Sequence, residues 1–270
     1  MAVNIDIRPS GIESGVTSGV NFSEALKELK SRKIKQKVIP FEQNAQLRIQ
    51  EGREAYISQN GNYVREGCIY YQGEAGILVP NSPFLTNSKM LQCAIEENRQ
   101  GRYFSTPNKR LYEKFSQQAQ QDASKAPKER RAVFMPSDNT FEVSQKQNSE
   151  IFELLGLSQA YLDFVKQDSL SFFPVGQKTL EGYFGTVPTQ LWFSWLVGGS
   201  GLVGDDRDLY IVGRVRGVRQ LDSSHISANA SQKNSQPRSE LYDSGKIRQA
   251  LVELGFSGLE AQLFKSLRTN

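Results

Sequence analysis

Histidine and cysteine are scarce in this chain of 270 residues, which has one histidine and two cysteines. His225 lies in a polar stretch with the composition of a linker, which argues against Ser-His-Asp and Cys-His catalysis and against His-rich metal sites. Cys68 and Cys93 do not form a CxxC pair, so neither a zinc site nor a disulfide framework is indicated. We therefore expect no catalytic residues, no metal and no cofactor, and the balance favours a protein that is not an enzyme.

A long hydrophobic run is also missing. The segment Gly182 to Gly204 has no charged residue, but six of its residues are glycine, five are Thr, Gln or Ser, and Pro188 interrupts it. A membrane-spanning helix needs roughly 20 mainly apolar residues, so we expect no span. The segment holds both tryptophans, Trp192 and Trp195. Three interpretations remain: a core strand or short helix, a buried subunit interface, or a loop inserted shallowly into a membrane.

Charge of one sign does not dominate the chain, which has 33 basic and 29 acidic residues and a net charge of +4. Such a mixed surface permits nucleic-acid binding without implying it. Asp6 and Arg8 stand where a secretory signal needs apolar residues. We therefore expect a protein in the cytoplasm, or within a particle assembled there.

The patterns along the chain predict an α+β fold, with an antiparallel β meander and hairpins packed against several amphipathic helices, and a helical C-terminal tail. They divide the chain into four parts: an extended N-terminal arm at 1–20, a main α+β domain at 21–221, a polar linker or long loop at 222–240, and a C-terminal helical segment at 241–270.

Local signals give the expected elements. Asn21-x-x-Glu24 is a capping box and predicts the start of a helix. Asn60-Gly61 between short aromatic and β-branched runs predicts a hairpin. Other strand patterns predict a meander through 68–71 and 77–79 and a second hairpin through 133–134 and 141–143. Further helices are expected at 88–100, from 106, at 151–155 and at 161–165.

Arginines gather near the end of the main domain. The stretch 209–218 is strongly strand-like, and strand alternation puts Arg214 and Arg216 on one face with Tyr210. We expect a partner-binding surface made of Trp192, Trp195, Arg207, Arg214, Arg216 and Arg219. The alternatives are an ordinary solvated edge, or a nucleic-acid surface of Lys30, Arg32, Lys33, Tyr210, Arg214 and Arg216, in which cations contact phosphates and the tyrosine stacks on a base.

Two further patterns bear on catalysis. Asp205, Asp206 and Asp208 form either a divalent-cation site or a charged turn before an edge strand. The stretch LYIVGRVRGVR, Leu209 to Arg219, resembles the second half of the GIY-YIG nuclease signature. It departs from that signature by the extra Val212 and by the lack of a GIY tripeptide upstream, so we assign no catalytic role from it.

These observations favour a non-enzymatic structural subunit of a large macromolecular assembly, phage-particle-like or a comparable bacterial complex, that acts through protein–protein interfaces. Its expected partners are other protein subunits in a homo- or hetero-oligomer. The alternative is a nucleic-acid-binding protein or nuclease of a mobile element or defence system.

Overall fold

The computed structural model describes residues 3–7, 12–17, 21–31, 36–71, 73–100, 109–181, 186–194, 200–204 and 214–220. All of them belong to one unit of the chain, residues 1–220, whereas residues 221–270 form a second unit. The linker expected at 222–240 and the helical segment expected at 241–270 lie outside the described residues. The described part contains helices together with antiparallel and mixed sheets, which confirms the predicted α+β class.

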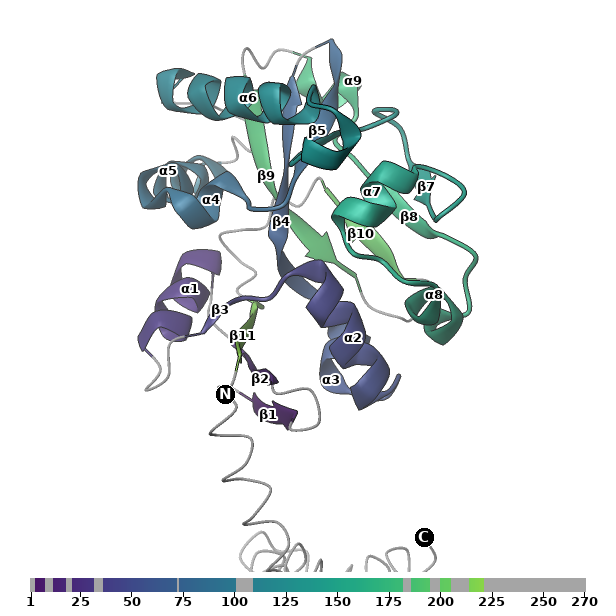
Figure 1. Cartoon of the computed structure of the whole chain (residues 1–270). Coiled ribbons are helices and arrows are strands. Elements are labelled where there is room, and N and C mark those ends of the chain that lie inside the picture. The colour runs from purple at the N-terminus through teal and green to yellow at the C-terminus, as the bar shows by residue number, and fades with distance from the viewer. Residues whose placement is uncertain are drawn as a thin grey trace, which may run out of the picture. The chain divides into compact units, whose positions relative to one another are not determined.

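A seven-stranded sheet runs through the described unit, in the order β6-β5-β4-β9-β10-β8-β7 (Figure 1). Neighbouring strands pair antiparallel except β8 and β10, which are parallel. The strands are β4 (Asn62–Tyr71), β5 (Glu74–Val79), β6 (Val133–Phe134), β7 (Phe141–Val143), β8 (Leu170–Phe173), β9 (Thr186–Phe193) and β10 (Gly201–Val203).

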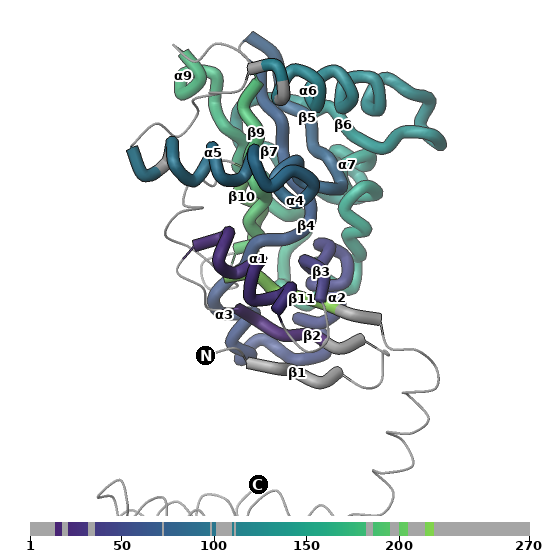
Figure 2. The backbone as a smooth tube through the Cα atoms, turned by 90° about the vertical axis from the view of Figure 1, so that its left-hand side faces the viewer, coloured from purple at the N-terminus to yellow at the C-terminus, as the bar shows by residue number. Residues whose placement is uncertain are grey.

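A four-stranded sheet has the order β1-β2-β11-β3 and lies beside the start of β4 (Figure 2). Its strands are β1 (Val3–Ile7), β2 (Ile12–Val16), β3 (Lys37–Val38) and β11 (Arg216–Gln220). Strands β1 and β2 pair antiparallel, so residues 3–7 and 12–16 belong to a sheet, whereas the sequence analysis expected an extended arm at 1–20. Ser14 and Val16 are two residues apart on β2 and therefore share one face of the strand. Both side chains are buried, and this burial holds β2 in the sheet.

Helices cover both faces of the larger sheet. They are α1 (Phe22–Ser31), α2 (Phe41–Glu51), α3 (Tyr56–Asn60), α4 (Pro83–Thr86), α5 (Ser88–Arg99), α6 (Lys109–Ala123), α7 (Ser149–Leu154), α8 (Gln159–Val165) and α9 (Gln177–Leu180), with a 3-10 turn at Pro127–Glu129. Strand alternation sorts the core between the two faces. Ile69 and Ile77 pack under Ala119 of α6, whereas Cys68 and Leu78 belong to the core that contains residues of α2, α7 and α8.

Several expected elements are confirmed. The backbone N–H of Glu24 donates to Oδ1 of Asn21 at 2.9 Å, as the capping box predicts for the start of α1. Strands β4 and β5 pair as an antiparallel hairpin, with Cys68 opposite Leu78. The helices expected near 88–100, 151–155 and 161–165 are α5, α7 and α8, and α6 occupies much of the one expected from 106.

Two hairpin predictions are wrong. The residues before Gly61 form the short helix α3, and Gly61, at φ 66°, follows its last turn. Glycine at positive φ ends a helix as readily as it forms a hairpin turn, so the Asn60-Gly61 signal was ambiguous. Strands β6 and β7 do not pair with each other. They lie at opposite edges of the larger sheet, where β6 pairs with β5 and β7 with β8.

Candidate functional site

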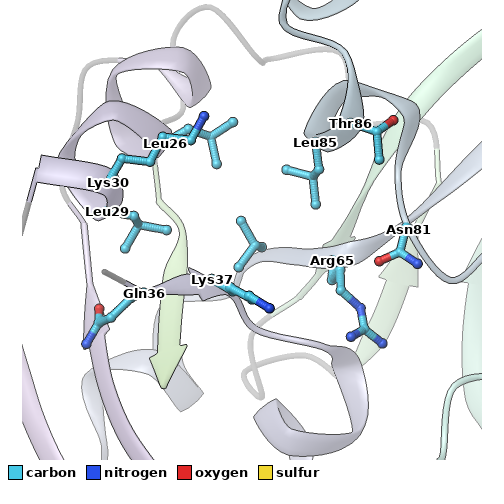
Figure 3. A pocket seen from close by; sticks show the side chains of 10 residues that line it. Leu26, Leu29, Lys30, Gln36, Lys37, Arg65, Asn81, Leu85 and Thr86 are labelled. Atoms are coloured by element: carbon cyan, nitrogen blue, oxygen red, sulfur yellow. The ribbon is translucent and has the colours of Figure 1, made fainter. Parts of the chain in front are cut away.

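A pocket of about 280 Å³ opens between α1, β3, β4 and α4 (Figure 3). Its apolar wall comes from Leu26 and Leu29 of α1, Val38 of β3, and Leu85 of α4. Figure 3 shows Leu26, Leu29 and Leu85 pointing toward the same space from two different helices. The pocket is therefore built from segments that are separate in the sequence and meet only in the fold.

Local sequence explains how α1 forms its side of this pocket. Leu26 and Leu29 are three residues apart, which places both on one face of a helix. Leu29 is fully buried and lies against Gly217 of β11, where any side chain would overlap it. The glycine thus lets α1 lie directly on the smaller sheet, and Leu26 is left half-buried at the pocket.

The pocket carries positive charge at its edge. Lys30, Lys37 and Arg65 line it, and among the described lining residues none is acidic. Lys30 and Lys37 are exposed. Arg65 is held in place because its Nε donates to the carbonyl of Pro80 at 3.1 Å. Lys30 was a candidate in the nucleic-acid interpretation, whereas Arg32 and Lys33 of that set lie outside the described residues.

A buried carboxyl group lies behind Arg65. Oε1 of Glu66 is 3.9 Å from the Arg65 guanidinium, and Oε2 accepts a hydrogen bond from the backbone N–H of Phe41 at the start of α2, at 3.0 Å. The side chain of Glu66 is only 3% exposed. Burial raises the pKa of this carboxyl group to about 7, and its hydrogen bonds and Arg65 offset that rise only in part.

Trp192, Arg214 and Tyr56 form a second feature, which we call the arginine–aromatic cluster. Trp192 is 7% exposed and packs edge-on against the buried Tyr63, with ring centroids 4.9 Å apart. The guanidinium carbon of Arg214 lies 5.7 Å from the ring centroid of Tyr56 and 5.9 Å from that of Trp192, and its Nη1 donates to the carbonyl of Asn60. Tyr56 is 50% exposed, so the cluster reaches the surface.

Arg216 corrects the expectation that two arginines share a solvent-facing strand face. Its side chain is fully buried, forms an ion pair with Glu51 of α2, and donates to Oγ of Ser14 at 3.0 Å. Burial lowers the pKa of Arg216, and Glu51 opposes that change. The cause is the position of β11, which is an inner strand of the smaller sheet and faces α2 there.

Helix α2 presents a polar row to the interior through Asn44, Arg48 and Glu51, whose spacing of four and three residues keeps them on one face. Arg48 is fully buried and donates to the carbonyls of Ser194 at 2.7 Å and Phe193 at 3.1 Å. Burial lowers its pKa. The sequence analysis missed this network, although N-x-x-x-R-x-x-E inside an otherwise apolar helix face was a visible signal.

Six further candidate residues lie outside the described residues: Trp195, Asp205, Asp206, Arg207, Asp208 and Tyr210. Arg219 is on β11, where its backbone pairs opposite Glu13 of β2. Within the described ranges, no group of three or more His, Cys, Asp or Glu residues is arranged to hold a metal ion. Nor do those ranges contain a helix that is long and apolar enough to cross a membrane.

Comparison with known proteins gives a likeness of fold. No protein-family model matches the chain, and no curated protein matches its sequence. A solved structure described under "accommodation of massive sequence variation in Nanoarchaeota by the C-type lectin fold" matches 76% of this chain and 96% of its own. The sequence identity is 12% and the TM-score is 0.50. The matched part of the chain is therefore similar to the C-type lectin fold.

Proposed function

We propose that the protein is a non-enzymatic structural subunit that docks onto another protein subunit through the surface around Tyr56 and Arg214. The observation that carries this proposal is the arginine–aromatic cluster, in which a half-buried arginine lies near both a half-exposed tyrosine and a buried tryptophan. Tyr, Trp and Arg are the residue types that dominate the energetics of protein interfaces.

Rigidity of the cluster supports this role. Trp192 is fixed by its contact with Tyr63, which in turn packs edge-on against Phe22 at 4.9 Å. Arg214 is held by the carbonyl of Asn60. A surface whose side chains are already ordered loses little conformational entropy when a partner binds. Fully burying a large apolar side chain contributes about 1.5–3 kcal/mol, and a partner that covers Tyr56 would gain roughly half of that, because half of the residue is already covered. The partner would also strengthen the cation–π contacts of Arg214 by removing water.

The likeness of fold is compatible with this proposal. In the nanoarchaeal case, the C-type lectin fold accommodates massive sequence variation. A fold with that property serves as a scaffold whose surface is free to differ, which suits a subunit defined by the surface it presents. The partner tested first is a second copy of this chain, because most soluble oligomers are symmetric homo-oligomers.

Size-exclusion chromatography with light scattering on the full chain, over a range of concentrations, tests the proposal. We expect concentration-dependent self-association that Tyr56→Ala and Arg214→Gln each weaken. Phe134→Ala is the matched control, because Phe134 is a comparably exposed aromatic residue, at 45%, on the edge strand β6. A wild type that stays monomeric, or an equal effect of all three variants, contradicts docking of a second copy through this cluster.

The same protein preparation also tests the alternative that the cluster binds nucleic acid. A labelled oligonucleotide bound through phosphate contacts would dissociate steeply as the salt concentration rises. If such binding is found, and Arg214→Gln lowers the slope of log affinity against log salt by about one, the cluster is a nucleic-acid surface and the protein-docking proposal is wrong.

A further inference from the structure

We propose that the pocket between α1 and α4 binds a small amphipathic anion, an aliphatic chain with a carboxylate or phosphate head. This goes beyond the proposed assembly role, because the pocket and the arginine–aromatic cluster have no residue in common. The inference rests on the lining of the pocket: four aliphatic and three cationic side chains contribute to it, and none of the described lining residues is acidic.

The volume limits the size of the ligand. A pocket of about 280 Å³ corresponds to about nine molecules of liquid water at roughly 30 Å³ each. The pocket is therefore near the lower end of known ligand pockets, which begin at about 300 Å³. A chain the size of octanoate fits this space, whereas a folded partner or a nucleic-acid backbone would only touch its opening.

The lining also orients the ligand. Leu26, Leu29 and Leu85 point into the space from α1 and α4, and they would surround the aliphatic chain (Figure 3). In Figure 3, Lys30 lies on the upper side of the space beside Leu26, whereas Lys37 and Arg65 lie on its lower side with their charged ends directed away from Leu26 and Leu85. We expect the charged head on that lower side, where two of the three cations are. Asn81 adds an amide group to that side. The charged ends of the exposed lysines stay hydrated until an anion binds, and this hydration favours reversible binding.

Arg65 is the fixed cation of the site. Its hydrogen bond to the Pro80 carbonyl orients the guanidinium, and its side chain is 41% exposed. A planar guanidinium binds carboxylate and phosphate oxygens in pairs, unlike the point charge of a lysine. We therefore expect Arg65 to fix the position of the head group, and the two lysines to add attraction without fixing geometry.

Methyl NMR on the full chain, labelled at Leu and Val and titrated with octanoate, tests the inference. We expect saturable shifts of the methyl signals of Leu26, Val38 and Leu85, and none of Leu170, a fully buried control on β8. Affinity should rise roughly three- to fourfold for each methylene from butanoate upward, and should stop rising once the chain fills the pocket. The double variant Lys30→Gln/Lys37→Gln should weaken binding about tenfold, because it removes two positive charges that attract the anion. Both side chains are exposed, so the fold should stay intact.

Four outcomes would overturn the inference. Octanoate could leave the pocket signals unshifted at millimolar concentration. Octylammonium could shift them as strongly as octanoate, which would remove the role of charge. Affinity could keep rising with chain length beyond the pocket, as in non-specific adsorption. Finally, inorganic phosphate or a short oligonucleotide could shift the same signals as strongly as octanoate, and the site would then be a phosphate contact without a chain pocket. Tyr56→Ala should leave octanoate binding unchanged, so failure here is separate from failure of the docking proposal.

Discussion

The guanidinium carbon of Arg48 lies 3.6 Å from the centroid of the Phe193 ring, so a charged group of α2 is stacked inside the core on the last residue of β9. Its Nη atoms also donate to the carbonyls of Phe193 and Ser194. One side chain thus ties α2 to the end of β9.

Replacing Arg48 should destabilise the fold strongly. Arg48→Met keeps much of the volume but leaves those buried carbonyls without their charged donor, and each hydrogen bond to a charged group contributes about 1.5–3 kcal/mol. We expect the free energy of unfolding to fall by about 3 kcal/mol or more in urea. Arg53→Met is the control, because Arg53 is an exposed arginine that donates to the carbonyl of Phe164, and its loss should cost less than about 1 kcal/mol. Similar losses for the two variants would contradict a special role for Arg48.

The ion pair between Arg216 and Glu51 predicts a non-additive pair of mutations. Arg216→Met or Glu51→Leu alone leaves the other charge buried without its partner, which typically costs about 3–5 kcal/mol. The double variant removes both charges and should recover a large part of that loss. A double-mutant cycle from chemical unfolding measures this coupling. If the two single losses simply add, the ion pair does not hold the two elements together.

Glu66 predicts a pH dependence of stability. Its pKa is raised from 4.5 in the unfolded chain to about 7 in the folded one. Between these values the folded protein keeps a proton that the unfolded chain has released, so the free energy of unfolding should fall as the pH rises through this window. Each pKa unit of difference corresponds to about 1.4 kcal/mol, which makes the total a few kcal/mol at most.

Glu66→Gln tests this origin of the pH dependence. The amide oxygen can still accept the hydrogen bond from Phe41, and the residue no longer titrates. The variant should therefore lose this part of the slope, and above pH 7 it should be at least as stable as the wild type. Urea unfolding at several pH values provides the measurement, with the exposed Glu129→Gln as a control that should keep the wild-type slope. Parallel curves for wild type and Glu66→Gln would contradict the assignment.

Trp192 predicts a large loss on truncation. Trp192→Ala removes a ring that is 7% exposed and contacts Tyr63, and such a change in a core costs about 3–5 kcal/mol. Phe134→Ala, at an exposed aromatic residue, should stay within about 0.5 kcal/mol of the wild type. Chemical unfolding of the two variants gives the comparison. A small effect at Trp192 would mean that the surrounding core closes over the space left by the ring.

Local patterns in the sequence predicted those parts of the fold that depend on neighbouring residues. Asn21 caps α1 as expected, and the strands on either side of Gly73 form the predicted hairpin. The failures depend on distant residues. Strand alternation grouped Arg214 with Arg216, but β11 begins only at Arg216, and Arg214 lies near Tyr56 and Trp192 instead. The approach of α2, which buries Arg216, could not be read from the local pattern.

The pocket could not be predicted from the sequence, because it too depends on distant residues. Lys30 was a visible candidate, but nothing in the sequence places Arg65 or Leu85 near it, because these residues come together only when α1 and α4 pack around β4. Of the three interpretations left open for the charge-free segment, the core strand applies to β9, where Gln190 and Leu191 are fully buried. Residues 182–185 and 195–199 of the segment lie outside the described residues.

The smaller sheet can be completed only after residues 216–220 have been synthesised. Ser14 on β2 bonds Arg216 on β11 across 202 positions of the chain, and β2 has β11 as a direct neighbour. On the ribosome, the first hairpin therefore emerges long before its neighbouring strand exists. Pairing over such separations is slow, because a long loop must close before any contact is gained. A nascent chain halted before β11 would hold the polar row of α2 without Arg216, and we would expect it to depend on chaperones until β11 is synthesised.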